Sequence, residues 1–319
     1  MKEQIGGGYS VYLLINTFSY CAVDGFAIIS GYMANNRPRK WSRLVEMWFQ
    51  ALFYSFVITL ILVFAGIGSG LGIMGVIRCA LPVTSEYFWY FTAFFGLYFV
   101  IPVLDRFLFA VEVDVARKAF IIIVMLFSVM GTVGDPFQSN RGYSLIWLAA
   151  LYCIGVLAKR IQLFESRKSG FLIMIWGICV IVTWGARIYG IDQLTNYVSP
   201  TIMFSGLIMV ILFSRLQISN KLSTIITHLS PLAFGIYLFQ LNRIIWENLI
   251  KDAFISVAGK PLYVGIPMTF MFAFVIFISG LVVEFLRTKA ADFIKIPNIS
   301  KKIAGLVDYI MRKCFIFLK

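Results

Sequence analysis

Several ionisable residues lie within or at the edge of long apolar runs, where a charge is costly in lipid and usually faces a cavity or a polar partner. Asp24 lies in the middle of the first run. Glu86 opens a later run, Arg187 closes another, and Arg243 and Glu247 lie four residues apart, on one helix face. Arg243 and Glu247 either pair with each other or face a cavity, whereas Asp24 has no cation near it in sequence. Asp24 is therefore the strongest candidate for a residue that lines a membrane-embedded cavity.

A short basic segment, residues 37–43, has the sequence RPRKWSR. Its four cations are Arg37, Arg39, Lys40 and Arg43. Arginine forks bind phosphate well, so this segment is a candidate site for a polyanionic cytosolic donor such as the phosphates of CoA. The alternative is an ordinary cluster of cytoplasmic cations that fixes the topology of the neighbouring helices.

The other motifs carry little chemistry. Residues 70–75 match G-x-G-x-x-G, but no strand precedes them, so we do not predict a dinucleotide site. His228 is the sole histidine, and its place just before an apolar run is more typical of a solvated or capping residue than of a catalytic base. The five cysteines have no CxxC spacing, and no metal site is predicted.

The composition predicts an all-α, polytopic transmembrane bundle. Hydrophobic residues make up 60% of the 319 residues and charged residues 13%, against about 25% charged in soluble domains. Most cations flank apolar runs instead of forming one basic face, so nucleic-acid binding is not expected. Nine runs approach the length of a spanning helix: 9–33, 47–68, 86–108, 119–134, 143–158, 169–190, 198–214, 231–250 and 262–286.

The distribution of Lys and Arg predicts the orientation. With the N-terminus outside and the C-terminus inside, three quarters of the 28 Lys and Arg residues fall in cytoplasmic segments, as the positive-inside rule requires. The start, MKEQIGGG, does not resemble a signal peptide. Residues 1–290 form the predicted transmembrane domain. Residues 291–319 are a predicted amphipathic cytoplasmic tail on the membrane surface, with lysines facing anionic lipids.

Five segments, in order along the chain, resemble the integral-membrane acyltransferase family 3 proteins, which are O-acetyltransferases of surface polysaccharide and peptidoglycan. DGFAIISGYM (24–33) is similar to the family signature VDLFFVISGF, and Lys40-Trp-Ser-Arg43 matches its Lys/Arg-x-x-Arg element. The remaining three are YFWYFTAFFGLYFVIPVLD (87–105), GYSLIWLAALYCIGVLAKR (142–160) and PLAFGIYLFQLN (231–242).

The resemblance implies a multi-pass enzyme of the bacterial cytoplasmic (inner) membrane, with no bound cofactor. It implies transfer of an acyl group, usually acetyl, from acyl-CoA to a hydroxyl of a surface saccharide or lipid-linked glycan. The basic segment would then bind the donor. The candidates for lining the cavity are Asp24, Glu86 and Tyr90, and those for binding the acceptor are Arg141, Gln240 and Arg243.

Two departures from the family pattern keep alternatives open. The family's catalytic histidine lies on a first helix that would precede Met1, and Gln240 replaces the late-motif histidine. Glutamine cannot take a proton at neutral pH. We expect a start upstream of Met1. The alternatives are an inactive or N-terminally truncated paralogue that acts as a binding partner, or a saccharide flippase or exporter. An exporter would predict inverted repeats, which the sequence does not show.

Overall fold

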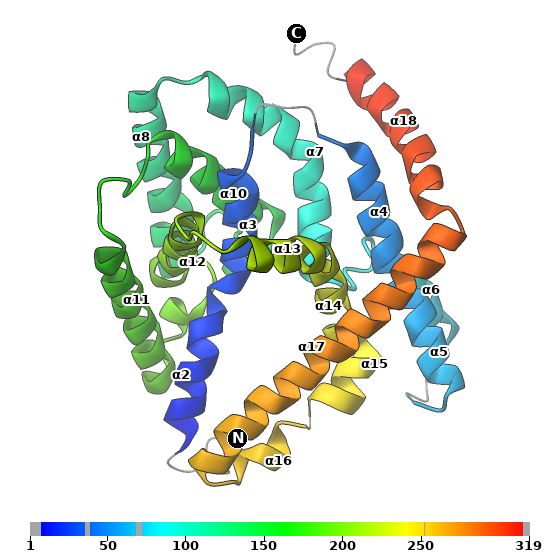
Figure 1. The fold of residues 1–319 in the computed structure, drawn as a ribbon. Helices are drawn as coiled ribbons and strands as arrows, with labels where there is room; N and C mark the ends of the chain where they lie inside the picture. Colours follow the sequence, from blue (N-terminus) through cyan, green and yellow to red (C-terminus); the bar gives the residue numbers. More distant parts are fainter. Residues whose placement is uncertain (1–7, 36–38, 68–71, 252, 315–319) are drawn as a thin grey trace. The chain divides into compact units, whose positions relative to one another are not determined.

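Every regular element in the part of the chain that the structure describes is helical, which confirms the predicted all-α class. The computed structural model describes residues 8–35, 39–67, 72–251 and 253–314. A helix satisfies its own backbone N–H and C=O groups, which long apolar segments must do in lipid. The helices form two compact units (Figure 1), each described by itself below.

Unit 1 comprises the described residues between 39 and 92 and between 218 and 314. Its helices are α4 (Trp41–Leu52), the π-helix η2 (Phe53–Val57), α5 (Ile58–Phe64), α6 (Ile73–Ala80), α13 (Asn220–Leu229), the 3₁₀ turn η6 (Ser230–Leu232), α14 (Ala233–Gln240), α15 (Arg243–Ile245), the π-helix η7 (Trp246–Ile250), α16 (Ile255–Ala258), α17 (Leu262–Phe293) and α18 (Ile296–Cys314). Helix α14 packs on α17, and α18 lies along α4 (Figure 1).

Unit 2 comprises residues 8–35 and 93–217. Its helices are α2 (Tyr9–Tyr20), α3 (Ala22–Tyr32), the greater part of α7 (Trp89–Ala110), α8 (Val113–Ile123), the π-helix η3 (Val124–Val129), α9 (Met130–Val133), the 3₁₀ turn η4 (Asn140–Gly142), α10 (Leu145–Arg160), α11 (Ser169–Tyr189), the 3₁₀ turn η5 (Asp192–Thr195) and α12 (Pro200–Ser214). Helix α10 is the core of this unit, because residues 150–158 are all buried.

Two glycines allow α3 and α10 to pack with their backbones in contact. A Cβ atom on Gly31 would lie 2.0 Å from the carbonyl oxygen of Tyr152, and one on Gly155 would lie 2.2 Å from that of Ile28. Small residues at helix contacts are typical of membrane bundles. Gly31 and Gly155 belong to the segments 24–33 and 142–160, so these two motifs meet in the core of unit 2.

Seven helices in the described residues are long and apolar enough to cross a membrane. They are Tyr9–Tyr32, Trp41–Phe64, Trp89–Ala110, Ser169–Tyr189, Asp192–Ser214, Asn220–Gln240 and Leu262–Phe293. The two predicted runs outside this set, 119–134 and 143–158, are also helical, but α10 has only 16 residues. Seven and nine are both odd, so either count places the two ends of the bundle on opposite sides.

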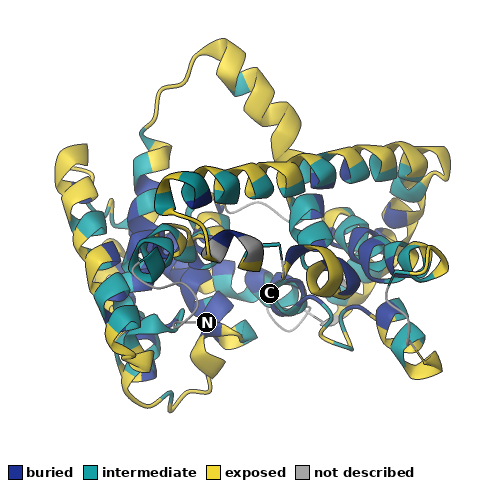
Figure 2. Cartoon of the chain, turned by 90° about the horizontal axis from the view of Figure 1, so that it is seen from below, coloured by how far each residue is buried: buried dark blue, intermediate teal, exposed yellow. Residues whose placement is uncertain are grey.

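Large apolar side chains on the helix surfaces fit a lipid environment. Figure 2 shows exposed positions along helices of both units, and on α17 these include Phe270, Phe274 and Val282. A soluble protein rarely exposes an apolar surface of this extent, whereas a membrane protein covers it with lipid. The chain is therefore a multi-pass membrane protein.

Candidate functional site

The predicted site residues are divided between the two units. Asp24 and Arg141 belong to unit 2. The others in the described residues belong to unit 1: Arg39, Lys40, Arg43, Glu86, Tyr90, Gln240 and Arg243. Arg37 lies outside the described residues.

Asp24 is a fully buried carboxyl group in the first turn of α3. The indole Nε1 of Trp147, in the first turn of α10, donates a hydrogen bond of 3.1 Å to Asp24 Oδ1. Asp24 Oδ2 has no hydrogen-bond partner among the described residues. Buried polar atoms are nearly always paired, so an open carboxylate oxygen at this depth marks a site for a hydrogen-bond donor.

Tyrosines from three segments gather one helical turn from Asp24. Tyr20 stacks on Tyr197 with ring centroids 4.9 Å apart, and Tyr143 meets Tyr197 edge-on at 5.3 Å. The guanidinium of Arg187 lies 4.9 Å from the ring centroid of Tyr20. No pattern in the sequence singles out these tyrosines, because they come from segments more than 50 residues apart.

Arg187 is held on this tyrosine cluster by polar side chains of α2. Its Nη1 donates to Asn16 Oδ1 at 2.7 Å and to Thr17 Oγ1 at 3.1 Å. Arg187 is half-buried at the edge of the apolar run. Its cation is stabilised there by the ring of Tyr20 and by the two side-chain oxygens that accept its hydrogen bonds. Arg141, by contrast, is exposed and has a left-handed backbone conformation (φ 55°).

A second buried acid in unit 2, Asp105 on α7, is one that the sequence analysis missed. Tyr152 Oη of α10 donates a hydrogen bond of 2.5 Å to Asp105 Oδ1. Arg160, at the end of α10, donates to the backbone carbonyls of Leu108 and Val111. These contacts fix α7 against α10 and satisfy carbonyls at the C-terminal end of α7.

The described part of the basic segment, residues 39–43, lies in unit 1 at the N-terminal end of α4. Lys40 is the N-cap residue, and its side chain makes no capping hydrogen bond. Lys40 and Arg43 are exposed, and Arg39 is half-buried. The helix dipole attracts anions at such an end, and the neighbouring cations add to this attraction.

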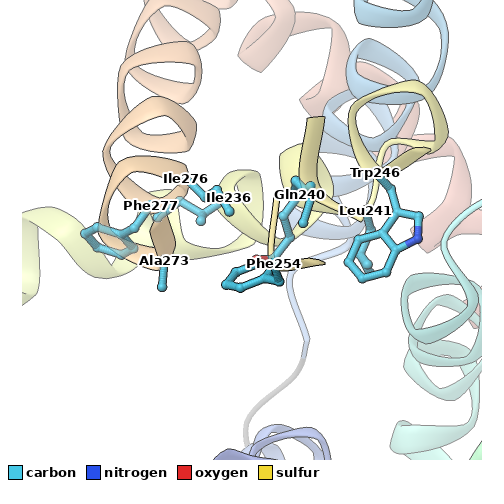
Figure 3. A pocket seen from close by; sticks show the side chains of 9 residues that line it. Ile236, Gln240, Leu241, Trp246, Phe254, Ala273, Ile276 and Phe277 are labelled. Carbon is cyan, nitrogen blue, oxygen red and sulfur yellow. The ribbon is translucent and has the colours of Figure 1, made fainter. Parts of the chain in front are cut away.

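The other predicted residues of unit 1 have diverse surroundings. Glu86 is exposed with a left-handed backbone conformation (φ 51°). Tyr90 is half-buried, and its ring lies edge-on to that of Tyr237, 6.2 Å between centroids. Arg243 Nε donates to Glu247 Oε1 at 3.1 Å, and both side chains are largely exposed. Gln240 lines an open, largely apolar groove between α14 and α17 (Figure 3).

The densest polar cluster in unit 1 surrounds Glu284 of α17, which the sequence analysis also missed. Its carboxylate accepts hydrogen bonds from Gln50 Nε2 (2.9 Å) and Tyr54 Oη (2.9 Å). Arg287 donates twice, from Nε (2.9 Å) and from Nη2 (2.7 Å). A Cβ atom on Gly235 of α14 would lie 2.2 Å from Glu284 Oε2. The signal in the sequence is an acid within the apolar run 262–286.

Asn242, which follows α14, connects the end of that helix to η2 and α5. Its Nδ2 donates to the Tyr54 carbonyl (2.8 Å) and to Thr59 Oγ1 (3.0 Å). Its Oδ1 accepts from the backbone N–H groups of Ile244 and Ile245 and so caps α15. The fully buried Asn242 therefore ends the run that begins in α13 and starts a new helix.

Metal-ligating residues do not cluster in the part of the chain that the structure describes. No group of three or more His, Cys, Asp or Glu residues there could hold a metal ion. Cys21, Cys79, Cys153 and Cys179 are free thiols. His228 is exposed in the last turn of α13.

Comparison with known families gives one match. A family model described as an acyltransferase domain matches residues 4–286, which include every residue of the clusters described above except Arg287. It is the family that the five motifs resemble. No curated protein and no solved structure matches the chain.

Proposed function

The chain belongs to the acyltransferase 3 family, and from this premise we propose that it transfers an acyl group, in the first instance acetyl, from acyl-CoA to a hydroxyl of a surface saccharide or lipid-linked glycan. Membership supports a membrane acyltransferase in general. The donor, the acceptor and the bacterial cytoplasmic membrane as its location are the proposal. The family match over most of the chain is the observation that carries it.

The donor is assigned to the N-terminal end of α4. CoA carries several phosphates, and the exposed cations Lys40 and Arg43 lie at the positive end of the α4 dipole. An arginine fork forms two charge-assisted bonds with one phosphate. No cofactor is needed, because the thioester already activates the acyl carbonyl.

The transfer requires one proton acceptor. The acceptor hydroxyl oxygen forms a bond to the acyl carbon, the C–S bond of the thioester breaks, and CoA leaves as the thiol after the hydroxyl proton has been removed. Asp24 is our candidate for the group that accepts a hydrogen bond from this hydroxyl or from the base, because Asp24 Oδ2 is open. Trp147 fixes the orientation of the carboxyl group through Oδ1.

Acetyl-CoA binding and turnover by the purified full chain in nanodiscs test the proposal. The Arg43→Ala variant should raise the KM for acetyl-CoA about tenfold, the effect of losing one charge-assisted phosphate contact. The KM for a soluble N-acetylglucosamine oligomer used as the acceptor should change little. The matched control is Arg106→Ala, which removes an exposed arginine of unit 2.

Three results would count against the proposal. Equal increases in both KM values would remove Arg43 from the donor site. Absence of acetyl-CoA binding by the unmodified chain would overturn the proposed enzyme. Binding of acetyl-CoA or saccharide without any transfer would favour the alternative, an inactive paralogue that acts as a partner.

A further inference from the structure

Helix α18 carries a line of exposed apolar side chains beside the side that packs on α4. The side on α4 includes Ser300, which is fully buried, and Ala304, which is 9% exposed. The exposed side chains are spaced by four, three and four residues, so they lie along one face of the helix. They are 39–61% exposed and are called the α18 stripe below: Ile299, Ile303, Leu306 and Ile310.

The beginning of α18 is tied to a helix that is long and apolar enough to cross a membrane. That helix is α17, and α18 begins three residues after it ends (Figure 1). Lys295, between the two helices, has a left-handed backbone conformation (φ 63°), and the chain turns there. Residues 287–293 extend α17 past its apolar run by about 10 Å, close to the depth of the headgroup layer. The stripe therefore begins near a membrane surface, where a protein partner would have to displace lipid.

Cations border the stripe. Lys302 precedes Leu306 by four residues, and its side chain is exposed. Lys313 follows Ile310 by three residues and is exposed as well. Residues 295–313 contain five Lys or Arg residues and a single acid. An apolar stripe with cations beside it complements an anionic bilayer, in which headgroup phosphates cover hydrocarbon.

We propose that the α18 stripe binds the surface of an anionic lipid bilayer while the side with Ser300 and Ala304 stays on α4. The hydropathy of the tail predicts membrane contact for all its apolar residues. In the described residues, packing on α4 restricts that contact to the stripe. With the predicted cytoplasmic C-terminus, the partner is the anionic cytoplasmic leaflet. The inference goes beyond the proposed function and does not depend on it, because acyl transfer does not use this surface.

The test measures lipid contact at the stripe in the full chain. In a cysteine-free background, Leu306→Cys is labelled with the fluorophore NBD and placed in phosphatidylcholine nanodiscs, with or without phosphatidylglycerol. Doxyl-labelled lipid quenches NBD on contact. Gly305→Cys is the matched control, since Gly305 is exposed at the next position, about 100° around the helix. With phosphatidylglycerol, quenching at Leu306→Cys should be about twofold greater or more, because an interfacial helix inserts its apolar face about 5–10 Å.

A pair of charge variants tests the role of the anionic headgroups. Lys302→Glu, added to Leu306→Cys, should abolish the increase in quenching that phosphatidylglycerol produces. Lys301→Glu makes the same change at the neighbouring position, on a side of α18 away from the stripe, and should preserve that increase. Both lysines are exposed, and thermal unfolding in the same nanodiscs checks that the two variants are equally stable. High salt should weaken the increase in the parent chain.

Three results would overturn the inference. Equal quenching at Leu306→Cys and Gly305→Cys would mean that the stripe is not in lipid. Quenching that is the same without phosphatidylglycerol, or that both lysine variants reduce equally, would remove anionic lipid as the partner. NBD on Leu306→Cys that is protected from doxyl lipid and also from aqueous iodide would mean that a protein covers the stripe. None of these measurements uses acetyl-CoA, so the proposed enzyme is tested separately.

Discussion

Glu284 is a buried carboxylate whose hydrogen bonds compensate for its removal from water. Gln50, Tyr54 and Arg287 all donate to it, and its side chain is 1% exposed. Removing one member of a buried ion pair leaves the other charge without a partner. It therefore lowers the free energy of unfolding more than replacing both members with apolar residues does. The cluster joins α4, η2 and α17, so its integrity affects the whole of unit 1.

The first prediction concerns this ion pair. Glu284→Gln leaves the Arg287 guanidinium, 16% exposed, without its counter-charge, and should reduce the free energy of unfolding by about 3 kcal/mol. Glu284→Leu combined with Arg287→Leu should be less destabilising than Glu284→Gln alone. Unfolding in mixed micelles measures both. A double variant that is less stable than Glu284→Gln would show that the pair is strongly stabilising in itself.

The second prediction concerns Gly235. An alanine Cβ there would meet the Glu284 carboxylate at 2.2 Å, so Gly235→Ala should separate α14 from α17 and destabilise the protein by about 1–3 kcal/mol. Gly177→Ala in α11 is the control, because nothing lies within 4 Å of its Cβ. It should be neutral or slightly stabilising, since alanine favours helix. Thermal unfolding in detergent compares them, and equal shifts would contradict the packing argument.

The third prediction concerns Asp24. Asp24→Asn keeps an oxygen that accepts from Trp147 Nε1 and replaces the open Oδ2 with an amide. The fold should therefore persist, while acyl transfer should fall about a hundredfold if the carboxylate accepts a proton or positions the base. Thermal unfolding and transfer rate are measured on the same sample. Full activity of the variant would exclude Asp24 from the chemistry.

Single residues were predictable from the sequence where a charge interrupted an apolar run. Asp24 was found in this way, and Glu284 carries the same signal. The tyrosine cluster carried none, because tyrosines are common at membrane interfaces and Tyr20, Tyr143 and Tyr197 meet only in the folded unit. The open oxygen of Asp24 depends on the packing of its neighbours and is likewise invisible in the sequence.

At the scale of elements, hydropathy located most helices but gave wrong bounds for one apolar helix. The predicted run 231–250 is interrupted after Gln240, and the apolar helix begins at Asn220. The reason is Asn242, whose side chain caps α15 and bonds to the Tyr54 carbonyl and Thr59. A cap of this kind is set by tertiary contacts, and a single asparagine in an apolar run does not reveal it.

The fourth prediction concerns α18, the predicted amphipathic tail, which packs along α4 with Ala304 buried. Ala304→Glu would bury an unpaired charge, so α18 should detach and trypsin should cleave after Lys301 and Lys302 about tenfold faster or more. Gly305→Glu adds the same charge at the next position, where nothing lies within 4 Å of the Cβ. Its cleavage rate should stay near that of the parent chain. Equal acceleration would mean that α4 does not hold α18.

At the scale of the whole molecule, the seven-span and nine-span counts differ only in the side of the membrane on which residues 135–142 lie. With the predicted N-out orientation, the runs 119–134 and 143–158 flank residues 135–142, which lie outside if both runs cross and inside if neither does. Ser128 Oγ donates to the carbonyl oxygen of Val198 at 2.7 Å. Val198 lies between α11 and α12, a connection that both counts place outside. This contact favours the nine-span arrangement.

The fifth prediction follows from that contact. In a cysteine-free background, Pro136→Cys should react with a membrane-impermeant maleimide added to intact cells, because Pro136 is exposed in the loop after α9. Gln193→Cys, which both counts place outside, is the positive control, and Ser166→Cys, which both place inside, is the negative control. Labelling of Pro136→Cys only after the cells are opened would mean that neither run crosses. Labelling of Ser166→Cys in intact cells would instead reverse the whole orientation, and the basic segment before α4 would then lose access to cytosolic CoA.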